Sequence, residues 1–143
     1  MGDRCYLTLY WKTSDTKKFL KALNREGCGD GLDPSGYFDE IDQTEPTSRG
    51  SVEEANYAWC AELTRIAKRG IVFHGNHSEG GEYGPFVFVS WGGRYYENET
   101  DRDTTPTVGL DDDGNPFPNQ LAQARRYLWA IKKAAAYCQK KVA

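Results

Sequence analysis

A short polar segment between two apolar runs holds both histidines of the chain, and chemistry is first expected there. Residues 74–84 read His-Gly-Asn-His-Ser-Glu-Gly-Gly-Glu-Tyr-Gly and separate the apolar runs 71–73 and 86–89. Apolar runs of this length favour strands, and a loop held between two strands is a common place for binding or catalytic groups. We therefore expect a ligand-binding surface made of His74, Asn76, His77, Glu79, Glu82 and Tyr83, with Arg94 and Tyr96 from the next hairpin.

The same segment offers nitrogen and carboxylate ligands of the kind that zinc accepts, in the pattern His74-x-x-His77-x-Glu79-x-x-Glu82. On a straight strand, however, residues three apart face opposite sides, so these ligands converge only if a turn lies between them. A helix is disfavoured by the glycines of the segment. The sequence therefore favours a loop ordered by ordinary hydrogen bonds, and we expect no metal and no cofactor.

Catalysis is the alternative interpretation of this segment. A histidine titrates near neutrality, so His74 or His77 could act as a base, oriented by Glu79 or Glu82. Nothing in the spacing specifies a known mechanism, which leaves a small hydrolase or transferase using a loop histidine with a glutamate. The four cysteines form no Cys-x-x-Cys pair, which argues against a zinc knuckle or a redox dithiol. We expect all four to be buried or unreactive thiols.

Charge is strongly segregated although the net charge is only −3. Residues 30–54 hold eight acids and one base, residues 97–113 hold seven acids and one base, and residues 119–143 hold six bases and no acid. The basic C-terminal helix suggests nucleic-acid binding through Arg125 and Arg126 as a second alternative. Because the chain is acidic overall, we favour a solvated basic face instead. Its complementarity to the acidic loops is compatible with a homo-oligomer.

The pattern of the chain predicts an α+β domain over residues 1–143. Alternation in 5–12 predicts a strand, and Phe19, Leu20 and Leu23 predict a helix that ends at Gly27. Capping-box spacing from Ser51 predicts a second helix that ends at Gly70. Strands follow at 71–74, 86–91 and 94–97, the last two joined by a type I′ turn at 92–93.

A third helix is predicted near the C-terminus, with an apolar stripe made of Leu121, Ala124, Leu128, Ile131, Ala135, Cys138 and Val142. Long polar loops are expected at 27–50 and 98–118, with an acidic turn at 111–116. The expected order is β-α-α-β-β-β-α, with about four antiparallel strands and three helices mainly on one face. No apolar run reaches the roughly 18 residues of a membrane span, and residues 1–4 lead into no signal-peptide core. We expect a cytoplasmic protein with no membrane partner.

Three islands of the sequence resemble small proteins of phages, prophages and other mobile elements: 2–6 (Gly-Asp-Arg-Cys-Tyr), 53–58 (Glu-Glu-Ala-Asn-Tyr-Ala), and 74–75 with 80–84. The resemblance implies no assigned activity. It implies an accessory protein acting by stoichiometric binding in the host cytoplasm, including counter-defence by inhibiting a host immune protein or by sequestering a small polar or nucleotide-like ligand. It also groups the helix segment around Asn56 with the 74–84 loop as parts of one binding surface.

Overall fold

The chain folds around a six-stranded antiparallel sheet. The computed structural model describes residues 4–78, 85–101 and 105–140, and the six strands counted here lie within them. Their order across the sheet is β2-β3-β1-β4-β5-β6, so the first strand of the chain is central and β6 is an edge. The strands are β1 (Arg4–Lys12), β2 (Glu40–Asp42), β3 (Thr47–Asn56), β4 (Phe73–His77), β5 (Phe86–Trp91) and β6 (Arg94–Glu99).

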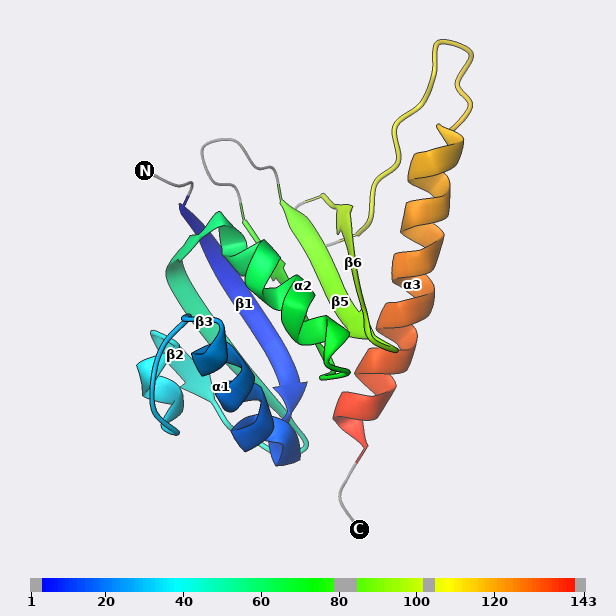
Figure 1. Cartoon of the computed structure of the whole chain (residues 1–143). Coiled ribbons are helices and arrows are strands. Elements are labelled where there is room, and N and C mark those ends of the chain that lie inside the picture. Colours follow the sequence, from blue (N-terminus) through cyan, green and yellow to red (C-terminus); the bar gives the residue numbers. More distant parts are fainter. Residues whose placement is uncertain (1–3, 79–84, 102–104, 141–143) are drawn as a thin grey trace.

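Helices cover both faces of this sheet. The helices α1 (Thr16–Arg25) and α2 (Cys60–Lys68) pack on one face, where they enclose the larger hydrophobic cluster. The helix α3 (Pro118–Gln139) packs on the other face against β5 and β6 (Figure 1). The expectation that the helices lie mainly on one face is therefore wrong for α3. Because alternate residues of β5 point to opposite faces, Phe88 joins the first cluster while Val87 and Val89 join the second.

Several local predictions are confirmed. Alternation in β1 buries Cys5, Leu7, Leu9 and Trp11, each at most 1% exposed. The β5–β6 hairpin turns at Gly92 and Gly93, whose φ angles of 61° and 81° are those of a type I′ turn. The α+β class, the antiparallel pairing and the three helices are as expected.

The number of strands and the start of the second helix were predicted wrongly. Residues 40–42 and 47–56 are strands, so the expected loop at 27–50 supplies an edge of the sheet instead. Ser51 begins no helix, because residues 51–56 complete β3 and pair with β1, and α2 begins only at Cys60. Local capping chemistry was outweighed by hydrogen bonding along the whole length of a central strand.

The helix α3 buries only part of the predicted stripe: Ala124 and Cys138 are buried as expected, and the partly buried Ile131 packs against the cluster of Val87 and Val89. Its buried residues are Ala124, Tyr127, Ala130, Ala134 and Cys138, whereas Leu128 is 51% exposed. Small alanines let the helix approach the valines of β5 closely, so volume rather than hydrophobicity selected the buried face. Val142 lies outside the described residues. The described part of the 98–118 segment carries the expected acidic turn, in which the Asp111 carboxylate accepts hydrogen bonds from the amides of Asp113 and Asn115.

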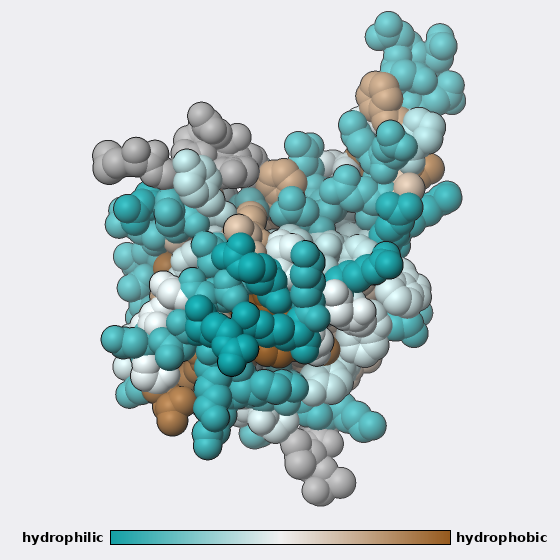
Figure 2. All heavy atoms as spheres, in the orientation of Figure 1, coloured by the Kyte–Doolittle hydropathy of each residue, from teal (hydrophilic) through white to brown (hydrophobic). Residues whose placement is uncertain are grey.

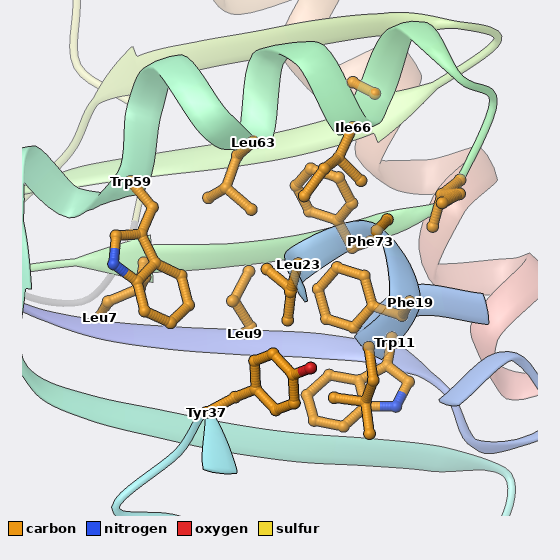
Figure 3. Packing of buried hydrophobic residues seen from close by; sticks show 14 of the residues in the cluster. Leu7, Leu9, Trp11, Phe19, Leu23, Tyr37, Trp59, Leu63, Ile66 and Phe73 are labelled. Atoms are coloured by element: carbon orange, nitrogen blue, oxygen red, sulfur yellow. The ribbon is translucent and has the colours of Figure 1, made fainter. Parts of the chain in front are cut away.

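The core beneath α1 and α2 is rich in aromatic side chains. Figure 3 shows Trp11, Phe19, Trp59 and Phe73 gathered with leucines between the helices and the sheet. Burying each large apolar side chain stabilises the fold by about 1.5–3 kcal/mol, so this cluster holds α2 firmly over the sheet. The face seen in Figure 2 is mostly hydrophilic.

Candidate functional site

The two histidines lie on a strand rather than in a loop. β4 continues through His77, so His74, Asn76 and His77 alternate across the sheet. Register with β5 pairs His74 with Val89 on the α3 face, while His77 pairs with Leu7 of β1 on the α2 face. The two imidazoles therefore cannot share one pocket. The expected convergence of His74 and His77 is wrong because the strand is longer than the apolar run indicated.

His74 is a packing residue. Its ring stacks on Tyr10 with a centroid distance of 5.1 Å and an interplanar angle of 14°. Burial lowers the pKa of His74 to about 4, so the ring is neutral at physiological pH. Asn76 shares this face of the sheet, opposite Val87.

The remaining predicted residues are dispersed. Glu79, Glu82 and Tyr83 lie outside the described residues. Asn56 is exposed at the end of β3, in a strand rather than the expected helix, and β1 separates it from β4. Arg125 is exposed on α3.

A pocket of about 690 Å³ follows the edge strand β6 between α2 and α3. Because β6 has a neighbour on one side only, a hollow beside it can take side chains from both faces of the sheet. The predicted residues Arg94, Tyr96 and Arg126 line it, and Gln123 of α3 donates a 2.6 Å hydrogen bond to the Glu97 carbonyl oxygen of the strand. The full lining is Thr64, Lys68, Gly93, Arg94, Tyr95, Tyr96, Glu97, Gln123 and Arg126.

Basic side chains outnumber acidic ones in the lining of the pocket. Lys68, Arg94 and Arg126 come from three different elements, α2, β6 and α3, and all three line the same hollow. Among the nine lining residues, all of them described, Glu97 is the acidic one. Cations from separate elements on a concave surface favour an anionic ligand over an apolar one.

At Glu97 the pocket adjoins a cluster of three chemically active side chains. One ligand atom each from Cys60, His77 and Glu97 lies within 4.8 Å of the other two. The three residues come from the start of α2, the end of β4 and the middle of β6. His77 is buried, whereas Cys60 and Glu97 are half-buried.

An unusual turn positions Cys60. Tyr57, Ala58 and Trp59 all have left-handed backbones, with φ angles of 52°, 51° and 53°. Such conformations cost about 1–2 kcal/mol for each non-glycine residue. Burial of the Trp59 indole in the core compensates part of this cost (Figure 3). The turn converts the direction of β3 into that of α2 and sets Cys60 as the first helical residue.

His77 is held by flat ring contacts. Its imidazole stacks on Phe86 at 5.2 Å and on Phe88 at 6.3 Å between ring centroids. Gly75 precedes it on the same face, and a Cβ there would lie 2.8 Å from the Phe88 ring and 2.0 Å from the Thr8 carbonyl oxygen. The glycine therefore allows the close strand packing that supports the histidine.

Burial sets the protonation of the cluster. It raises the pKa of Cys60 to about 11, with the Glu97 carboxylate adding to the effect. Burial also lowers the pKa of His77 and raises that of Glu97. The Tyr95 hydroxyl is buried beside the Cys60 thiol and acts in the opposite direction, towards a lower thiol pKa. At neutral pH the thiol is protonated and the imidazole is neutral, so the resting cluster contains no thiolate–imidazolium pair.

Sequence reasoning missed Cys60, Lys68 and Glu97 as site residues. Cys60 was expected to be an unreactive thiol, and the other two have the ordinary charge of surface positions. A weak signal was present in β6, where alternation places Tyr95 and Glu97 on the face opposite Arg94 and Tyr96. Because of this alternation, polar or charged side chains of β6 lie on both faces of the sheet.

The chain matches no family model, no curated protein and no solved structure. Among the described residues, none of the helices has the length and apolar character needed to span a bilayer.

Proposed function

We propose that the protein binds a small anionic ligand of the nucleotide type in the pocket beside β6. The observation that carries the proposal is the convergence of Lys68, Arg94 and Arg126 on one hollow of about 690 Å³. Sites for small molecules commonly measure about 300–1,000 Å³, so the hollow suits a ligand of nucleotide size.

The lining supplies complementary chemistry for both parts of such a ligand. Guanidinium groups bind phosphate through two parallel hydrogen bonds, which suits Arg94 and Arg126, and Lys68 adds a point charge. Tyr95 and Tyr96 provide aromatic surface for a base, with Thr64 and Gln123 as hydrogen-bonding groups. Arg94 and Tyr96 therefore remain proposed ligand-binding residues. Their neighbours in the site are residues of α2 and α3 instead of the expected residues 74–84.

A small ligand is favoured over a nucleic acid by the surrounding charge. Glu97 lines the pocket and the exposed Glu99 lies two residues further along β6. An extended polyanion that followed β6 would meet both acids, whereas a mononucleotide needs only the space beside Lys68, Arg94 and Arg126. Arg125 lies outside the lining, so the basic helix contributes through Arg126 rather than as a continuous strip.

Sequestration of the ligand is the biological role that we propose for this binding. It agrees with the resemblance to phage accessory proteins, for which we expect stoichiometric action and counter-defence in the cytoplasm of the host. Direct occupation of a host protein is the competing role, and a homo-oligomer formed through the basic helix is compatible with either.

Titration calorimetry with adenosine and guanosine mono- and triphosphates, and with inorganic phosphate, tests the proposal. We expect at least one nucleotide to bind, with a loss of affinity of about tenfold or more in Arg94→Gln and Arg126→Gln. Arg25→Gln is the matched control, since Arg25 lines a separate basic hollow of about 170 Å³. Absence of nucleotide binding, or equal effects of all three substitutions, would contradict the proposal.

The proximity of His77 to Glu97 favours a small hydrolase as the second candidate. The partner glutamate differs from the Glu79 or Glu82 of the sequence-based hypothesis. Chromatography of each nucleotide after incubation separates the two functions: a binder returns its ligand unchanged, and a hydrolase converts it at a rate that His77→Gln abolishes.

A further inference from the structure

We propose that Cys60, His77 and Glu97 form a binding site for one divalent transition-metal ion, with zinc the preferred ion. A thiol, an imidazole and a carboxyl group are gathered within 4.8 Å of one another from three separate elements. Tetrahedral zinc, with bonds of about 2.0–2.3 Å, holds its donors about 3.3–3.8 Å apart. Side-chain rotations that shorten these separations by at most about 1–1.5 Å close the triangle to that size.

The combination of donors selects the class of ion. Calcium and magnesium take oxygen ligands, and a site containing one sulfur and one nitrogen suits them poorly. Zinc accepts sulfur, nitrogen and carboxylate oxygen together, and a thiolate favours it over harder ions. The zinc pattern that the sequence analysis weighed and disfavoured was His74, His77, Glu79 and Glu82, and only His77 of that pattern belongs to this cluster.

The surroundings fix the donors in place. His77 is stacked on Phe86 and Phe88, and Cys60 is the first residue of a helix anchored by the buried Trp59. The Tyr95 hydroxyl lies beside the sulfur, where it can donate to a metal-bound thiolate. Outer groups of this kind orient metal ligands and tune their basicity.

The donors are also partly shielded from water. His77 is buried, and Cys60 and Glu97 are half-buried. The charge of a dication bound between them would therefore dominate the local field.

The position of Glu97 connects the metal site to the basic pocket. Glu97 belongs both to the cluster and to the pocket lining, so an ion held by it adjoins the hollow. Three protein ligands with one coordination position left for water or substrate is the arrangement of catalytic zinc sites, whereas structural sites use four protein ligands. The metal would thus place a further positive charge at the one end of the pocket that carries an acid.

Cobalt titration of the metal-free protein tests this inference without any nucleotide, so its outcome is independent of the proposed ligand. We expect one Co²⁺ per chain, with a thiolate-to-cobalt charge-transfer band in the near ultraviolet and the intense visible bands of tetrahedral Co²⁺. Added Zn²⁺ should displace the cobalt and remove both signals. If Co²⁺ binds but the charge-transfer band is missing, the ion is held away from Cys60 and the proposal is overturned.

Matched substitutions identify the ligands. Cys60→Ser should remove the charge-transfer band, and Glu97→Gln should weaken cobalt binding by about tenfold or more. The controls Cys28→Ser and Glu99→Gln alter a second half-buried thiol and an exposed carboxylate of the same strand, and should leave the spectrum unchanged. Circular dichroism verifies that each variant is folded. A wild-type protein that binds no cobalt, or a folded Cys60→Ser variant with the wild-type spectrum, would overturn the inference.

Discussion

Stability should depend on pH through His74, whose neutral form is built into the fold. Burial lowers the pKa of His74 from 6.5 to about 4. Between these values the unfolded chain binds the proton and the folded chain does not, so acidification favours unfolding. The stabilisation is complete above pH 6.5 and decreases as the pH falls towards 4. Since one pKa unit corresponds to about 1.4 kcal/mol, the loss is about 2 kcal/mol at pH 5 and about 3 kcal/mol at pH 4.

The variant His74→Phe isolates this contribution. Phenylalanine keeps an aromatic ring against Tyr10 but does not titrate. Urea denaturation of both proteins between about pH 7.5 and 4.5, with a chelator present, measures the free energy of unfolding at each pH. His77 contributes in the same direction and the raised pKa of Glu97 in the opposite one, but both are present in each protein and cancel in the difference. We expect the wild type to lose about 2 kcal/mol more than the variant by pH 5. Parallel stability curves would refute the assignment of His74 as a buried neutral ring.

Two further predictions test the packing that positions the site. Gly75→Ala places a Cβ 2.0 Å from the Thr8 carbonyl oxygen, so it should cost about 2 kcal/mol or more in urea denaturation; Gly92→Asn, in open space at the turn, should change stability by less than about 0.5 kcal/mol. On α3, Ala130→Leu should destabilise by about 1–3 kcal/mol and Leu128→Ala by less than about 0.5 kcal/mol, because Ala130 is 0% exposed and Leu128 is 51% exposed. The reverse order of effects would show that the predicted apolar stripe, rather than the alanine face, meets the sheet.

The fold class could be predicted because its strongest elements are locally encoded. β1 shows a clear alternation of apolar residues, and the paired glycines at 92–93 determine a hairpin with little help from the rest of the chain. The helix α2 ends at Lys68, and Gly70, with a φ angle of 83°, is the left-handed residue just beyond it, as its sequence position indicated.

The missing strands carry no such pattern. β3 buries Ser48, Gly50, Ser51 and Ala55, which are small residues without hydrophobic alternation. Gly50 is covered by the Phe38 ring, which would lie 2.7 Å from a Cβ at that position. The apolar atoms that cover β3 thus come from another part of the chain. Because the strand itself carries few apolar side chains, its sequence has the pattern of a polar loop.

The geometry of the candidate site depends on the register of β4 against β5 and on the residue at which α2 begins, and neither can be predicted from the sequence. Glu97 faces the same side as Phe88 because the two-residue turn fixes the β5–β6 register. The register of β4 against β5 is set across a long connection, and a slip of one residue would move His77 to the opposite face, away from Cys60. The start of α2 depends in turn on three left-handed residues, none of them glycine, which residue preferences do not anticipate. The face of the sheet on which Glu97 lies could therefore be predicted from the sequence. The approach of Cys60 to His77 required the tertiary packing that pins Trp59 in the core, and disruption of that packing should separate the cluster before it unfolds the sheet.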